Sequence, residues 1–233
     1  MCNQASVVLV EDCRFFANSG VRGAAIYNRA DSQITIRHSH FVDNQIERFG
    51  AVYAYQSAIA IEGSSFGGNV ARCPTPLCGG SGLTLYYADG EVQHTIFDGN
   101  SAQYLGGAVH ISQSDAVFSS VIFAENVAAE GGAIQSIATQ LIVEGSSFFG
   151  NRADTGGGLH LEGSRVQLHH CDLDGNTANA GGAINAIDGT SLLVDGCGFY
   201  DNQSATHGGA VLFAGSTQRV QHSVFVGNAT RQD

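Results

Sequence analysis

The stretch FFGNRADTGGGLHLEGS, residues 148–164, contains the two motifs that decide the fold. Phe148 opens an F-x-x-N motif, and a run of three glycines then precedes the alternating pair Leu159 and Leu161. Glycine-rich turns bind phosphate when they open a helix. Apolar residues that alternate with a period of two predict a strand instead. The stretch therefore predicts a glycine corner that leads into a strand, and argues against a phosphate loop.

Both motifs recur along the chain. F-x-x-N begins at Phe15, Phe41, Phe66, Phe97, Phe123, Phe148, Phe199 and Phe225, and a variant copy begins at Leu173. Successive copies are 25 or 26 residues apart, apart from one interval of 31. A glycine box, GGA or a looser variant, follows after eight or nine residues. A fixed period of this length is typical of a solenoid in which each repeat forms one coil.

Each repeat contains three short segments with strand character. Apolar residues alternate after the glycine box, as in Val109 and Ile111, and alternate again before the Phe, as in Val166 and Leu168. A third short strand surrounds the Phe itself, and no repeat contains a helical pattern. We therefore predict an all-β, parallel β-helix of eight to nine coils, with three strands per coil and the coils about 4.8 Å apart.

Stacking converts each column of the repeat into a ladder in space. The Phe column becomes an aromatic stack in the interior. The Asn column is filled in all nine copies, and its amides are expected to satisfy the backbone of the turns and one another. This predicted ladder consists of Asn18, Asn44, Asn69, Asn100, Asn126, Asn151, Asn176, Asn202 and Asn228.

Repeated F-x-x-N followed by GGA[ILV] resembles the repeat of the polymorphic outer membrane proteins, a family found in chlamydial autotransporter adhesins and in other bacterial surface proteins. The resemblance extends from Phe15 to Asn228. It implies a right-handed, pectin-lyase-like parallel β-helix, which we expect to form one domain over residues 1–233. It also implies an autotransporter-like adhesin that is secreted or held at the cell surface, although the sequence contains neither a signal-peptide pattern nor the family's membrane barrel.

Charge excludes two kinds of partner. The formal net charge is −11, with no lysine and ten scattered arginines. Nucleic acids and anionic membranes need clustered basic residues, so neither is expected as a partner. No apolar run approaches the ~20 residues of a membrane-spanning helix, so membrane insertion by this chain is not expected either.

Six cysteines fall into three candidate pairs. Cys73 and Cys78 bracket the sequence CPTPLC in a loop insertion at about 72–80, and a disulfide that closes this loop is expected. Cys171 and Cys197 share an interior column of neighbouring coils, where they either form a disulfide or pack as small apolar residues. Cys2 and Cys13 are placed to fix the first coil. These positions favour an oxidising compartment.

Several motifs resemble metal-binding or catalytic sites but lack the neighbouring residues or elements that such sites need. His38, His94, His170 and His222 each precede an F-x-x-N motif by three residues, yet they lie in non-adjacent coils, about 10 Å or more apart, whereas zinc needs converging ligands. DLDGN at 172–176 lacks the closing acid of a calcium loop. GSSFG at 63–67 lacks the strand-to-helix elbow of a nucleophile. We expect no metal, no cofactor and no catalytic residue.

The outward positions of the strand after the glycine box form the most informative surface column. Five of the seven tyrosines gather near it in the early coils. Tyrosine rings stack on sugars, although ladders of aromatic residues also stabilise sheets without binding anything. The candidate ligand-binding residues are Tyr27, Tyr53, Tyr55, Tyr86, His110, His160 and Glu162.

Two functions follow as expectations. The first is a non-enzymatic extracellular or cell-surface scaffold, adhesin-like, that binds a protein or glycan at a cell surface. The alternative is a β-helix that binds or degrades polysaccharide with its Tyr and His face. Degradation needs converging carboxylates, and only Glu162 and Asp188 supply acids near this column. Neither end of the solenoid shows a cap, so flanking domains of a longer chain or end-to-end self-association are also expected.

Overall fold

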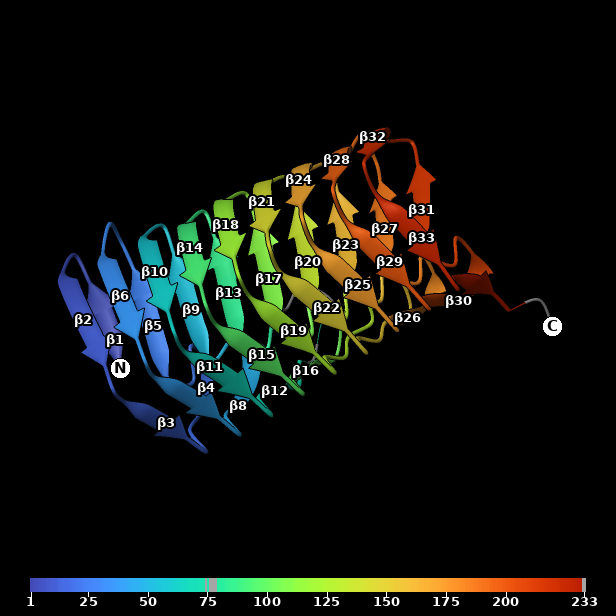
Figure 1. Cartoon of the computed structure of the whole chain (residues 1–233). Coiled ribbons are helices and arrows are strands. Elements are labelled where there is room, and N and C mark those ends of the chain that lie inside the picture. Colours follow the sequence, from blue (N-terminus) through green and yellow to red (C-terminus); the bar gives the residue numbers. More distant parts are fainter. Residues whose placement is uncertain (74, 76–78, 232–233) are drawn as a thin grey trace.

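The computed structural model places successive coils next to one another along a single axis, from the N-terminal to the C-terminal end (Figure 1). The structure describes residues 1–73, 75 and 79–231. Each strand pairs in parallel with the equivalent strand of the next coil, and the register follows the sequence repeat, so Phe41 pairs with Phe66 and Phe66 with Phe97. The described residues are all-β, and three strands recur in every coil, as predicted.

Three nine-stranded parallel sheets form the walls in the described part of the chain. Sheet A contains β1 (Cys2–Gln4), β5 (Ile26–Arg29), β9 (Val52–Tyr55), β13 (Leu83–Tyr86), β17 (Val109–Ser112), β20 (Ile134–Ile137), β23 (Leu159–Glu162), β27 (Ile184–Ile187) and β31 (Val211–Ala214). Sheet B contains β2 (Val7–Glu11), β6 (Gln33–Arg37), β10 (Ala58–Glu62), β14 (Asp89–Gln93), β18 (Asp115–Ser119), β21 (Gln140–Glu144), β24 (Arg165–His169), β28 (Ser191–Asp195) and β32 (Thr217–Gln221). Sheet C contains β3 (Arg14–Phe16), β7 (His40–Val42), β11 (Ser65–Gly67), β15 (Ile96–Asp98), β19 (Ile122–Ala124), β22 (Ser147–Phe149), β25 (Asp172–Asp174), β29 (Gly198–Tyr200) and β33 (Val224–Val226).

Two shorter sheets lie between the Asn turn and the glycine box, where the sequence did not predict strands. One contains β4 (Ser19–Arg22), β8 (Gln45–Phe49), β12 (Val70–Ala71) and β16 (Ser101–Ala102), and the other contains β26 (Thr177–Ala180), β30 (Gln203–His207) and β34 (Ala229–Thr230). Isolated parallel bridges at Val127 and Arg152 connect the two along the same side of the solenoid. This segment matters for function because it runs beside the outer face of sheet A.

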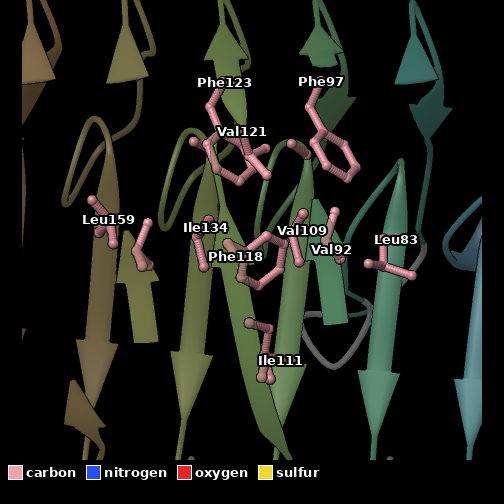
Figure 2. Packing of buried hydrophobic residues seen from close by; sticks show 14 of the residues in the cluster. Leu83, Val92, Phe97, Val109, Ile111, Phe118, Val121, Phe123, Ile134 and Leu159 are labelled. Carbon is pink, nitrogen blue, oxygen red and sulfur yellow. The ribbon is translucent and has the colours of Figure 1, made fainter. Parts of the chain in front are cut away.

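The interior is apolar and contains the predicted aromatic stack. Ring centroids lie 4.7 Å apart between Phe66 and Phe97, 5.3 Å between Phe97 and Phe123, and 4.7 Å between Phe123 and Phe148. Figure 2 shows Phe97 and Phe123 beside one another, with aliphatic side chains of sheets A and B filling the lumen next to them. Leu173 replaces an aromatic ring in the next coil and remains fully buried.

The predicted asparagine ladder is confirmed. Asn126, which is fully buried, accepts hydrogen bonds at Oδ1 from the backbone N–H and the side-chain amide of Asn100, both at 3.0 Å. Its own amide donates to the carbonyl of Phe97 and to Oδ1 of Asn151, both at 3.0 Å. The same pattern repeats from Asn18 to Asn228, so each coil is hydrogen-bonded to the next through its turn.

The glycine box is a corner at which neighbouring coils approach closely. A Cβ atom on Gly157 would lie 2.2 Å from the carbonyl oxygen of Gly182 in the next coil. Gly156 adopts a φ of +63°, which favours glycine. The three glycines of the opening motif therefore serve the packing of one coil against the next.

The cysteine predictions have mixed outcomes. Cys73 is disulfide-bonded, and Cys78, its expected partner, lies outside the described residues. Cys171 and Cys197 are buried free thiols, and the Cys171 N–H donates to Cys197 Sγ at 3.4 Å. The expected cross-link between Cys2 and Cys13 was wrong: both are free, because Cys2 lies in sheet A and Cys13 precedes the first strand of sheet C.

Candidate binding cleft

A cleft of about 650 Å³ lies on the outer side of sheet A in the early coils. All four tyrosines singled out from the sequence line it, together with His110. The described lining residues are Arg22, Tyr27, Arg48, Phe49, Tyr53, Tyr55, Thr75, Tyr86, Leu105, His110, Ser112 and Ile137. The sequence therefore located most of the aromatic wall, while His160 and Glu162 lie in a later coil and do not line this cleft.

The strand register builds the aromatic wall. Tyr27 pairs with Tyr53, and Tyr55 pairs with Tyr86, in adjacent parallel strands. The rings of Tyr27 and Tyr53 stack at 5.0 Å between centroids, and those of Tyr55 and Tyr86 stack at 6.0 Å. Tyr87 packs edge-on against Tyr86 at 4.7 Å. Because each ring is braced by a neighbour, the wall presents fixed aromatic surface to the cleft.

The outward column of sheet A is largely covered. Tyr53, His110 and His160 are each only 4% exposed. The residue just before the glycine box folds over this column: the ring of Phe49 stacks on Tyr53 at 4.8 Å, and Thr155 Oγ1 lies 3.0 Å from His160 Nδ1. The short strands and bridges beside sheet A carry these covering residues, which is why the strand pattern alone did not reveal them.

Arg22, Arg48 and Phe49 are among the lining residues that the sequence reasoning missed. All three lie within two residues of a glycine box, so the position before the box is the signal that could have identified them. No acid is present among the described residues that line the cleft, and both arginines are exposed there. The cleft is therefore aromatic and locally positive, in a chain whose net charge is −11.

The hydroxyls of Tyr53 and Tyr86 remain protonated over the physiological range, because the pKa of each is raised. Burial raises the pKa of Tyr53 far above its usual range, and the neighbouring phenol of Tyr27 raises it further. Burial and the adjacent Tyr87 likewise raise the pKa of Tyr86. Neutral hydroxyls can both donate and accept hydrogen bonds, so the wall offers apolar ring faces with polar tips.

His160 takes part in a separate polar cluster. Asn185 donates to His160 Nδ1 at 3.2 Å, and His160 Nε2 lies 3.9 Å from a carboxylate oxygen of Glu130, a residue that the sequence reasoning missed. Burial, followed by the charge of Glu162, raises the pKa of the Glu130 carboxyl. At His110 the direction of the hydrogen bond is reversed, because Nδ1 donates to Oε1 of the buried Gln135. These contacts pair both histidines outside the lumen, whereas Nε2 of Gln135 and Oδ1 of Asn185 are buried without a hydrogen-bond partner.

The buried histidines make stability depend on pH. Burial lowers the pKa of His110 and of His160 to about 4, whereas an unfolded chain binds the same protons near pH ~6.5. The unfolded state therefore binds more protons than the folded state between these two pKa values. As the pH falls through this range, the folded protein loses stability relative to the unfolded chain. We expect the free energy of unfolding to decrease between pH 7 and pH 5 by about 2 kcal/mol for each histidine.

Urea unfolding at the two pH values measures this decrease. The variant His110→Gln should lose a smaller part of its stability on acidification than the wild type does. His94→Gln is the matched control, because His94 is exposed in a turn. Equal losses in the wild type and in His110→Gln would contradict the assignment.

Among residues 1–73, 75 and 79–231, no group of three or more His, Cys, Asp or Glu side chains is arranged to hold a metal ion. The same residues contain no helix of the length and apolarity that a membrane crossing requires.

Parallel coils around an apolar lumen define the protein as a parallel β-solenoid. Residues 81–231 match the family described as the right handed beta helix region. Because this match covers more than half of the chain, the chain belongs to that family. No curated protein matches the chain. The family describes a fold that supports many functions, so function has to be argued from the cleft.

Proposed function

We propose that this protein is a non-enzymatic β-helix scaffold that binds a glycan in the tyrosine cleft. The observation that carries the proposal is the cleft of about 650 Å³ with four tyrosines and two arginines in its lining. A volume of this size is that of a small-molecule site and accommodates a few sugar rings. The rigid solenoid positions the wall, and the cleft supplies recognition.

The chemistry of the wall fits carbohydrate. Sugar rings present apolar C–H faces edged by hydroxyl groups, and aromatic rings with polar tips match both features. Tyr55 and Tyr86 are half-buried, so their rings stay accessible from the cleft. Arg22 and Arg48 add hydrogen-bond donors that can recognise oxygen atoms of the ligand.

Binding is favoured over degradation because the carboxylates lie elsewhere. Glycoside hydrolysis uses a pair of carboxyl groups at the bond to be cleaved, whereas Glu130 and Glu162 lie beside His160, outside the lining of the cleft. We further propose, from the likeness of the repeats to those of polymorphic outer membrane proteins, that the chain acts at a bacterial cell surface or after secretion, in an adhesin-like role.

A glycan array of neutral and acidic oligosaccharides tests the proposal. We expect the wild type to bind a subset of the array, and the double variant Tyr55→Ala/Tyr86→Ala to bind the same glycans about 10- to 100-fold more weakly, because each stacking ring contributes about 0.5–1.5 kcal/mol. Tyr200→Ala is the matched control, since Tyr200 lies in sheet C, away from the cleft. Absence of binding by the wild type, or equal binding by the double variant, would contradict the proposal.

A further inference from the structure

Sheet B carries a second concave surface, which the tyrosine cleft does not use. A depression of about 520 Å³ lies across the outer face of β6, β10, β14, β18 and β21. Two outward positions of β10 in its lining are alanines, Ala58 and Ala60, which pair with longer side chains on both neighbouring strands. The depression therefore results from side-chain size on an otherwise regular sheet.

One row of outward residues crosses this depression along the solenoid axis. Register pairs Ala60 with Glu91, Glu91 with Val117, and Val117 with Ile142, so these four residues form one row across four consecutive coils. Val117 is 39% exposed and Ile142 is 37% exposed. Four coils at a spacing of ~4.8 Å give this row a length of about 14 Å.

The described charged residues that line the depression are all acidic, and the nearest arginine along the same outward positions is Arg165 of the next coil, which pairs with Gln140. Asp89, Glu91 and Asp115 line the depression, and none of the other described residues that line it is basic. Gln140 donates to Asp115 at 3.3 Å, and Gln93 donates to Glu91, but none of the ion pairs found among the described residues involves these three acids. No ion pair among the described residues therefore neutralises these three acids.

From these features we propose that the outer face of sheet B binds an extended polypeptide segment in which basic side chains alternate with apolar ones. An extended chain rises ~3.3 Å per residue, so four or five residues along the axis cover the row. Apolar side chains of the segment contact Ala60, Val117 and Ile142. Its basic side chains, which alternate with the apolar ones, contact Glu91 within the row and Asp89 and Asp115 beside it.

Charge complementarity selects this partner over an acidic or a purely polar one. Three carboxylates close to an apolar surface repel an anionic ligand. A polar cationic chain would be attracted by the net charge of −11 but would leave the exposed apolar side chains of Val117 and Ile142 uncovered. Both charge and apolar contact are needed for binding at this position, and the site is independent of the glycan proposal.

Fluorescence anisotropy with three labelled ten-residue peptides tests the proposal on the wild type. The peptides alternate lysine with valine, lysine with serine, or glutamate with valine. We expect saturable binding of the lysine and valine peptide, with a Kd at least about tenfold lower than that of the lysine and serine peptide, and no binding of the glutamate and valine peptide. Equal binding of both lysine peptides, or no binding of either, would overturn the proposal.

Variants then locate the site. Asp89→Asn/Asp115→Asn and Val117→Ser/Ile142→Ser should each raise the Kd of the lysine and valine peptide by about tenfold. Asp172→Asn/Asp174→Asn removes the same charge from sheet C and should leave the Kd within about twofold. All of these positions are exposed, and circular dichroism checks each fold. A rise in Kd as large in the sheet C variant as in the sheet B variants would show that net charge alone attracts the peptide.

Discussion

Replacing one asparagine in the middle of the ladder is expected to destabilise the whole solenoid. Asn126→Ala removes an oxygen that accepts two hydrogen bonds from Asn100 and an amide that donates to Phe97 and Asn151. Alanine cannot replace these bonds, and water has no access to the fully buried turn. Each buried polar group left unpaired costs about 1–3 kcal/mol, so we expect a loss of roughly 3–6 kcal/mol.

Asn179→Ala is the matched control for this variant. Asn179 is exposed and makes one side-chain hydrogen bond, to Asp154 at 3.3 Å. Its replacement should change the stability by less than about 0.5 kcal/mol. Urea unfolding followed by circular dichroism compares both variants with the wild type. A loss below about 1 kcal/mol in Asn126→Ala would show that the ladder does not hold the coils together.

Replacing a ring in the middle of the aromatic stack should have a comparable effect. Phe123 is fully buried between Phe97 and Phe148, and Phe118 approaches its side at 5.8 Å. Phe123→Ala leaves a cavity that the rigid coils cannot close, and such substitutions cost about 3–5 kcal/mol. Phe123→Leu should lose less, because Leu173 occupies the same column in this chain.

The variant Phe149→Ala tests whether the loss of stability depends on the burial of the ring or follows from removing any aromatic side chain. Phe149 follows a member of the stack in sequence, but it lies on the outer face of sheet C and is 42% exposed. Its replacement should cost less than about 1 kcal/mol. The midpoint temperature of thermal unfolding should decrease in the order wild type, Phe149→Ala, Phe123→Leu and Phe123→Ala. A similar loss in Phe149→Ala and Phe123→Ala would contradict the interior position of the stack.

The architecture could be predicted from the sequence because a solenoid repeats the same local structure in every coil. The F-x-x-N spacing fixed the coil length, and the glycine box fixed the corner, so the positions of Phe148, Asn151 and Gly157 all followed from one column alignment. The short strands such as β8 and β30 could not be predicted in this way. Their residues pair only after the coils have stacked, and they have no alternating pattern of their own.

The cleft could be predicted only in part, for a similar reason. The tyrosines follow from the period of sheet A, whereas their cover comes from the segment just before the glycine box, where Arg22 and Phe49 pair beyond a register shift and show no strand alternation. The sequence places His110 and His160 correctly on the side of the sheet away from the lumen, but it cannot report that this side is covered. Burial outside the lumen is a property of the stacked coils.

The central claim, that the tyrosine cleft is the binding site, can be tested through the emission of the tyrosines themselves. The chain has no tryptophan, so its seven tyrosines dominate its intrinsic fluorescence, and four of them line the cleft. Titration with an oligosaccharide selected on the array should change this emission saturably in the wild type and in Tyr200→Ala, but not in Tyr55→Ala/Tyr86→Ala at the same concentrations. Saturable binding of that oligosaccharide by calorimetry, with no change in tyrosine emission and with equal affinity for the double variant, would contradict the account.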